Sequence, residues 1–314
     1  MVNVAIAGGN GGVGRAICDA LQRSTKHKAF VLTRKVSEAT SRVRSVQVDY
    51  TDVAGLTAIL EDLSIHTIIS TFHISGPSLS TSQLNLIKAA EASGCTKRFA
   101  PSAFAIPYPR EFVTALPPLK YYFEAIDILK ASELEWTVFL NGVFLDYYGM
   151  PHIKTYLAPN VFAIDMANKV AAIPGDGNTP VTFTWSMDLA KFIVAALDLP
   201  SWEEESRIVG DEVTFNQFVD MAEEVCGVKF ARSYDSVARL KAGEITELPG
   251  HLGLYADFPK PVFQRFMAIF EMWTIDGTST ISARGRILNA QFPDIRTLTA
   301  REMLDTYWSK GQNM

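Results

Sequence analysis

An apolar run that ends in closely spaced glycines constrains the fold of this chain more than any other segment. Residues 4–14 read VAIAGGNGGVG. The apolar residues predict a buried strand, and residues 15–21 predict the helix that follows it. Glycines at GxxGxxG spacing between them permit a sharp turn and let a pyrophosphate approach the helix N–H groups. An ordinary strand–helix turn is the alternative. We predict a dinucleotide site formed by Gly8, Asn10, Gly11, Gly12, Val13 and Gly14.

The first half of the chain alternates predicted strands with predicted helices. Such alternation with short connections predicts an α/β fold with a Rossmann-type, doubly wound parallel sheet. The pattern weakens after Gly142. We therefore expect a cofactor-binding domain over residues 1–150 and a smaller substrate-binding part over residues 151–314, from which some segments could return to the sheet. The predicted strands are 29–33, 46–48, 67–72, 98–101 and 136–140, and the predicted helices include 53–60, 83–92, 188–197 and 215–225.

Composition narrows the class of protein. The chain has 314 residues, of which 48% are hydrophobic, and no segment approaches the ~20 uninterrupted apolar residues of a membrane span. A net charge of −5 argues against nucleic-acid binding. The three cysteines are far apart and form no Cys/His cluster, so neither a disulfide framework nor a metal site is indicated. We expect a cytoplasmic protein that binds small molecules, with no membrane and no nucleic acid among its partners.

The residues after the second predicted strand bear on which dinucleotide binds. This strand ends in Thr33, Arg34 and Lys35, where NAD-binding proteins carry an acid for the ribose hydroxyls. A guanidinium binds a 2′-phosphate, whereas a carboxylate would repel it. The sequence thus favours NADP(H), although both cations could simply be solvated loop residues. Asp49, after the third strand, is a candidate for the adenine end, and Phe72, at the end of the fourth, completes the predicted cofactor site.

Several segments together resemble one protein family. They are GGNGGVG at 8–14, TRK at 33–35, RFAPSAF at 98–104, LEWTVFLNGVF at 134–144 and IPGDGNTPVTFTWSMDLAKFIVAAL at 173–197. On these motifs the chain resembles the NmrA-like, isoflavone-reductase-like branch of the atypical short-chain dehydrogenases. The resemblance implies a Rossmann domain that binds NADPH, often for reduction of a secondary metabolite. Some relatives act instead as nucleotide-sensing regulators, and a few catalyse cyclisation or rearrangement.

The proton donor is the point at which this chain departs from the family. Reductases of the family usually carry a lysine at the position of Tyr122, and the nearest lysine, Lys120, lies about 200° away around a helix. Carbonyl reduction needs a group that protonates the oxygen. The candidates are Tyr122, Lys120, Ser102 after the fifth strand and His73 after the fourth. Tyr122 could equally be a core aromatic, Ser102 a cap and His73 a loop residue.

The function predicted from these features is NADPH-dependent reduction of a C=O or an activated C=C. Phe263, Phe266, Phe270 and Trp273 share a helical face that is either core or part of a substrate pocket. A pocket lined by them would take an apolar, aromatic or polyketide-like secondary metabolite. The alternatives are a non-redox cyclase or isomerase on the same scaffold and a non-catalytic NADP(H)-sensing regulator.

Overall fold

The computed structural model describes residues 1–35, 43–73 and 76–309, and divides the chain into two compact units. The first unit comprises Met1–Phe104, Tyr108–Leu140 and Ala190–Ser206, and the second comprises Ala105–Pro107, Asn141–Leu189 and Arg207–Met314. Residues 190–206 thus belong with the first unit, although the sequence places the boundary near residue 150.

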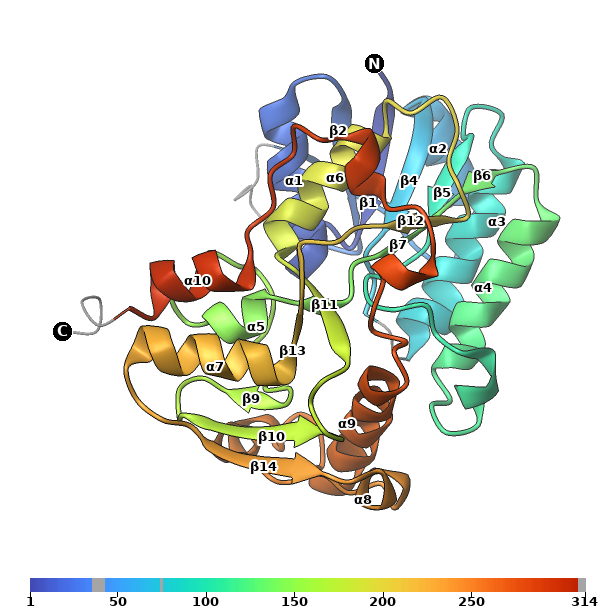
Figure 1. Ribbon diagram of the computed structural model, residues 1–314. Helices are drawn as coiled ribbons and strands as arrows, with labels where there is room; N and C mark the ends of the chain where they lie inside the picture. The colour runs from blue at the N-terminus through green and yellow to red at the C-terminus, as the bar shows by residue number, and fades with distance from the viewer. Residues whose placement is uncertain (36–42, 74–75, 310–314) are drawn as a thin grey trace. The chain divides into compact units, whose positions relative to one another are not determined.

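A parallel sheet of six strands forms the centre of the first unit (Figure 1). Its order is β3-β2-β1-β4-β5-β6, the order of the Rossmann fold, so the predicted fold class is confirmed. All of Val4 to Ala7 in β1 is buried, as expected for a central parallel strand covered on both faces. The strands are β1 (Asn3–Ala7), β2 (Lys28–Thr33), β3 (Arg44–Gln47), β4 (Ile65–Ser70), β5 (Arg98–Ala100) and β6 (Glu135–Trp136).

Helices cover both faces of this sheet. In Figure 1, α2, α3 and α4 lie together on one face and α1 lies on the other. Asp52 caps α2, because its side chain accepts a hydrogen bond from Gly55 N. Helix α6 begins within the residues of the second unit and ends within those of the first. The helical segments are α1 (Gly12–Ser24), α2 (Val53–Asp62), η1 (Ser78–Gln83), α3 (Leu84–Ala92), η2 (Arg110–Val113), α4 (Leu119–Ala131) and α6 (Ser186–Ala196).

The last predicted strand of this unit, 136–140, is two strands in the structure. Residues Glu135–Trp136 form β6 beside β5, whereas β7 (Val138–Leu140) pairs with β12 (Glu205–Arg207). The ladder changes partner at Thr137, whose N–H donates to Phe99 O at 3.3 Å, while Val138 N–H donates to Glu204 O at 2.9 Å. The prediction of a single strand over 136–140 was wrong, because β12, the partner of β7, is far from β7 in the sequence.

Residues 190–206 are held to the first unit by Arg98 of β5. Its guanidinium donates to Leu199 O at 2.9 Å and to Pro200 O at 3.0 Å, and it lies 5.1 Å from the ring centroid of Trp202. Arg98 also pairs with Glu135. A buried cation with these partners fixes the segment after α6 beside the sheet.

Two three-stranded sheets organise the second unit. In one, β10 pairs with β14 in parallel and with β9 antiparallel. In the other, β11 pairs with β13 antiparallel and with β8 in parallel. The strands are β8 (Val143–Phe144), β9 (Ile164–Asp165), β10 (Val170–Pro174), β11 (Pro180–Thr184), β13 (Asp211–Thr214) and β14 (Ala231–Asp235).

The helices of the second unit pack around an aromatic core. Phe183 of β11, Phe215 and Phe218 of α7, and Phe263 of α9 are buried in it. Thr214 caps α7, in a capping box with Gln217. The helical segments are α5 (Asp146–Gly149), α7 (Phe215–Cys226), α8 (Val237–Lys241), η3 (Pro249–Leu254), α9 (Lys260–Ile275), η4 (Ser282–Arg284), η5 (Leu288–Gln291) and α10 (Ala300–Tyr307).

Candidate cofactor site and active site

The glycine loop joins the carboxyl end of β1 to the start of α1. Gly8 has a φ of +82°, a conformation that favours glycine. A Cβ at Gly8 would lie 2.9 Å from Thr71 O, and a Cβ at Gly14 would lie 2.4 Å from Thr71 Oγ1. These two glycines therefore let the loop and the helix pack closely against the residue that follows β4.

Gly11 differs from these two glycines, because the packing of the protein does not require it. Apart from its chain neighbours, the one atom of the described residues within 4 Å of a Cβ at Gly11 would be Gly8 O, at 3.8 Å. The middle glycine of a dinucleotide loop is needed for the close approach of a pyrophosphate and not for packing. No side chain caps α1 at Gly11, and its first turn holds no acid. The N-terminal N–H groups of this helix thus remain available to a phosphate, so the loop fits a dinucleotide.

The turn at the end of β2 is braced by Thr33. Its hydroxyl donates to Lys35 O at 2.9 Å and accepts from Asn10 Nδ2 at 3.4 Å. Arg34 and Lys35 are exposed, and neither forms an ion pair with a carboxylate among the described residues. The register pairs Ala7 with Leu32, which places the glycine loop and this turn at the same edge of the sheet. Two exposed cations with no carboxylate partner among the described residues, next to a phosphate loop, suit a second phosphate.

Asp49 and Phe72 take different roles from each other. The Asp49 carboxylate accepts from Thr51 N at 2.8 Å and from Thr51 Oγ1 at 2.7 Å, and these bonds lower its pKa. It thereby stabilises its own turn. The ring of Phe72 packs edge-on against Tyr50, at 5.0 Å between centroids. Contact of either residue with the cofactor stays a prediction.

Ser102 and Phe72 lie side by side at the carboxyl ends of β5 and β4. The Ser102 hydroxyl donates to Phe72 O at 2.7 Å, and Ser102 N–H donates to Gln83 Oε1 at 2.9 Å. The Ser102 residue is only 3% exposed. His73 follows Phe72 directly and is exposed. The structure thus places two of the donor candidates, Ser102 and His73, near the same strand ends.

Tyr122 and Lys120 occupy different environments on α4. Tyr122 is 6% exposed, with its ring edge-on to Tyr108 at 5.3 Å and to Phe123 at 5.0 Å. Burial raises the pKa of its hydroxyl. Lys120 is exposed, and its Nζ lies 5.8 Å from the ring centroid of Tyr121. These surroundings favour the core reading of Tyr122 that the sequence left open.

The four aromatic residues of α9 are not equally buried. Phe263 and Trp273 are in the core, whereas Phe266 and Phe270 are half-buried, with ring centroids 4.6 Å apart. Phe263, Phe266 and Phe270 pack in or against the core cluster of the second unit. Phe266 and Phe270 are therefore the members of this stripe that remain candidates for substrate contact.

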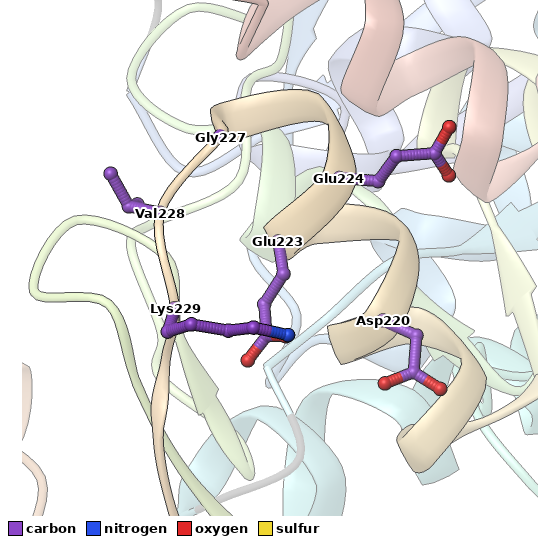
Figure 2. A pocket seen from close by; sticks show the side chains of 6 residues that line it. All are labelled: Asp220, Glu223, Glu224, Gly227, Val228 and Lys229. Atoms are coloured by element: carbon purple, nitrogen blue, oxygen red, sulfur yellow. The ribbon is translucent and has the colours of Figure 1, made fainter.

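A surface depression of about 400 Å³ lies beside the C-terminal end of α7 (Figure 2). Glu223 and Lys229 are among the residues that line it. In Figure 2 the Lys229 ammonium lies next to the Glu223 carboxylate. That carboxylate accepts from Lys229 at 2.6 Å, from Phe230 N at 3.0 Å and from Arg232 at 2.9 Å. Burial raises its pKa, but these bonds outweigh burial and lower the pKa to about 2. Its partners already satisfy the carboxylate, so this depression needs no ligand.

Two classes of site are missing from the described part of the chain. No group of His, Cys, Asp and Glu side chains there could hold a metal ion. No helix there is both long and apolar enough to cross a bilayer.

Gln83 is a site residue that the sequence reasoning missed. The sequence predicts only that Gln83 lies in a helix. Gln83 falls four residues after buried Leu79 and three before buried Leu86. A polar residue on the core face of an amphipathic helix is the signal that could have found it. In the structure it touches Ser102.

Comparison with known proteins agrees with this geometry. The profile of a family described as NAD(P)H-binding matches residues 8–200. The chain belongs to this family. The match begins at Gly8 and includes the Arg34 turn, Phe72 and Ser102, so all the candidate cofactor residues lie within it.

Individual relatives refine the assignment. Oxidoreductase BOA1 of Botryotinia fuckeliana is 36% identical over 94% of this chain and 96% of its own length. The isoflavone reductase homolog IRL of Zea mays is 25% identical and covers 97% of each chain. The predicted resemblance is therefore confirmed, and the chain is an oxidoreductase with an NAD(P)H cofactor.

The fold is shared with a solved reductase. The binary complex of leucoanthocyanidin reductase with NADPH from Vitis vinifera superimposes with a TM-score of 0.75. The alignment covers 98% of this chain and 99% of that one, at 20% identity. The whole chain thus has the architecture of that protein.

Proposed function

We propose that this chain is an NADPH-dependent reductase that acts on a C=O or an activated C=C of an aromatic or polyketide-like secondary metabolite. The observation that carries the choice of NADPH is the turn at the end of β2, where exposed Arg34 and Lys35 have no carboxylate partner among the described residues. A guanidinium in this position binds a phosphate in a bidentate manner. The solved relative named above was crystallised with NADPH.

Different residues of the chain bind the cofactor and transfer the proton. The N–H groups at the start of α1 hold the pyrophosphate, and Arg34 holds the 2′-phosphate. NADPH supplies a hydride when bound. The substrate oxygen or carbon that becomes negative must then receive a proton from the chain.

His73 is the residue that we assign to proton transfer. It is exposed directly after β4, at the edge of the sheet where ligands of such folds bind. An imidazole can both donate and accept a proton, which suits an acid that is reprotonated in every cycle. Ser102 is only 3% exposed, Tyr122 is buried among aromatic rings, and Lys120 lies next to Tyr121. These three have weaker support.

The aromatic class of substrate is supported by α9 and by the relatives. The half-buried rings of Phe266 and Phe270 offer a flat apolar surface. The solved relative is named for the reduction of a leucoanthocyanidin, and another is named as an isoflavone reductase homolog.

Isotope transfer tests the reaction. The protein is incubated with aromatic ketones, enones and polyketide lactones and with NADPH deuterated at the transferred position. We expect loss of NADPH absorbance and a product that carries the deuterium. We expect His73→Gln to lower kcat by about 100-fold without changing the NADPH Kd, whereas Lys88→Gln, the control at an exposed site on α3, leaves kcat unchanged.

The same assay includes the outcomes that reject the proposal. Conversion of a substrate without loss of NADPH would indicate a non-redox isomerase or cyclase instead. Binding of NADPH with no conversion in any member of the panel would favour the nucleotide-sensing regulator. Full kcat in His73→Gln, with loss of kcat in Tyr122→Phe or Ser102→Ala, would move the proton donor to that residue.

A further inference from the structure

Gln83 sits at an irregular point of the fold. It is the last residue of η1, a π-helical turn, and α3 begins at Leu84. Turns of this kind are often found at functional sites. The side chain of Gln83 is completely buried, at 0% exposure. A flexible polar side chain is thus held inside the first unit directly beside the strand ends.

One end of the Gln83 amide is occupied and the other is not. Oε1 accepts from Ser102 N–H at 2.9 Å, which fixes the orientation of the amide and leaves Nε2 as a donor. Nε2 has no hydrogen-bond partner within the described residues. Ser70 Oγ, at the carboxyl end of β4, is a second buried polar atom for which the described residues offer no partner. Buried donors are rarely left unsatisfied, because the lost bonds to water are not replaced.

The strand order shows which half of the cofactor this donor serves. In the order β3-β2-β1-β4-β5-β6 the dinucleotide crosses the edge of the sheet at β1. The adenosine half would lie over β1–β3, where Arg34 follows β2, and the nicotinamide half over β4–β6. Gln83 contacts Ser102 after β5, and Ser102 in turn contacts Phe72 after β4. The hydrogen bond between Gln83 and Ser102 is therefore on the nicotinamide side.

We propose that Gln83 is a positioning residue for the nicotinamide half of the cofactor. Its Oε1 accepts from Ser102 N–H and holds Ser102 next to Phe72. The positions of these two residues are therefore fixed before the cofactor binds. Its Nε2 hydrogen bond is completed when the nicotinamide half binds, through a water that this half orders between the strand ends. The inference rests on the NAD(P)H site and not on the proposed reduction.

Paired substitutions test the two hydrogen bonds of the amide. Gln83→Met keeps the length of the side chain but removes the donor and the acceptor, and Gln83→Leu also shortens it. Gln22→Met and Gln22→Leu on α1 are the matched controls. The Kd values of NADPH and of adenosine 2′,5′-bisphosphate, which lacks the nicotinamide half, are measured by calorimetry. The unfolding temperature of each ligand-free variant is measured as well.

We expect both Gln83 variants to weaken NADPH binding about tenfold and to change the Kd of the bisphosphate less than about twofold. Both controls should match the wild type for both ligands. Equal weakening of NADPH and the bisphosphate would overturn the proposal, because it would mean that Gln83 only supports the fold. An unchanged NADPH Kd in Gln83→Met would overturn the role of Nε2, because methionine offers no donor. If Gln83→Leu does not fold, Gln83→Met alone decides between these outcomes.

Discussion

At the scale of single residues, the glycine loop combines two separate requirements. Gly8 and Gly14 are needed because the backbone and Thr71 leave no room for a Cβ. Gly11 is needed only if a ligand approaches its open side. The sequence predicted the motif as a whole, but it could not tell these roles apart, since the difference lies in the distance to Thr71, a residue far away in the chain.

Alanine substitutions at these glycines should therefore have opposite effects. Gly11→Ala should leave the unfolding temperature within about 1 °C of the wild type, because among the described residues, apart from its chain neighbours, only Gly8 O lies within 4 Å of the new methyl group. It should weaken NADPH binding at least about tenfold, since the methyl group enters the path of the pyrophosphate. Gly14→Ala should lower stability by about 2 kcal/mol, because its Cβ would lie 2.4 Å from Thr71 Oγ1.

Thermal unfolding without ligand and calorimetry with NADPH check this pair. A destabilised Gly11→Ala that binds NADPH normally would contradict the distinction. So would a fully stable Gly14→Ala.

The surroundings of the proton-donor candidates were only partly predictable from the sequence. Position along the strands was enough to place Ser102 and His73 at the sheet edge. It was not enough for Tyr122, because a helical wheel gives the direction of a side chain but not what covers it. The rings of Tyr108 and Phe123 supply that cover. Gln83 was missed because the contact that marks it, with Ser102, joins residues nineteen positions apart.

At the scale of elements, the strands and helices of the first unit follow local sequence closely. Apolar runs predicted five of its central strands to within a few residues of their observed bounds. The exception is the segment around Thr137, where one apolar run serves two ladders. Local pattern cannot predict this, because the change of partner depends on Glu204 N-terminal to β12. The π-helical turn before α3 likewise has no period that distinguishes it from an α-helix in the sequence.

Helix α9 carries a buried acid that its apolar pattern hides. Glu271 is 2% exposed, and its Oε2 has no hydrogen-bond partner in the part of the chain that the structure describes. Burial, and then the charge of Asp235, raises its pKa well above the ordinary value, while Arg239 lowers it. Glu271 also interacts electrostatically with Tyr148, whose pKa it helps to raise. Glu271 is therefore protonated in the folded protein at a pH where it is ionised in the unfolded chain.

The raised pKa makes stability depend on pH. Between the unfolded pKa near 4.5 and the folded pKa, the folded state binds the additional proton, so the free energy of unfolding falls as pH rises. Glu271→Gln removes this loss. We expect the variant to match the wild type near pH 4.5 and to exceed it by at least about 1.4 kcal/mol at pH 8, the equivalent of one pKa unit.

Denaturant unfolding across this pH range measures the difference, with Glu91→Gln on α3, an exposed site, as the control. Parallel curves for the wild type and Glu271→Gln would contradict a neutral Glu271. A shift of equal size in Glu91→Gln would show that net charge, and not burial, causes it.

At the scale of the whole molecule, fold and cofactor class were predictable and the chemistry was only partly so. The alternation of strands and helices and the glycine loop suffice for the Rossmann sheet, because both are local features. The grouping of residues 190–206 with the first unit was not fixed by local features. It depends on the guanidinium of Arg98 and the carbonyls of Leu199 and Pro200, which no local pattern connects. The identity of the proton donor depends on which candidate side chains are buried. Burial is a property of the folded chain, and no local pattern determines it.

We propose that Arg34, in the turn after β2, gives the dinucleotide site its preference for NADPH over NADH. Calorimetric titration of the wild type and of Arg34→Ala with NADPH and NADH tests it most directly. One charge-assisted hydrogen bond to a phosphate is worth about 1.5–3 kcal/mol. We therefore expect Arg34→Ala to weaken NADPH binding about 10- to 100-fold and to leave NADH binding unchanged. Equal affinity of the wild type for the two nucleotides, or an NADPH Kd that Arg34→Ala does not alter, would contradict the account.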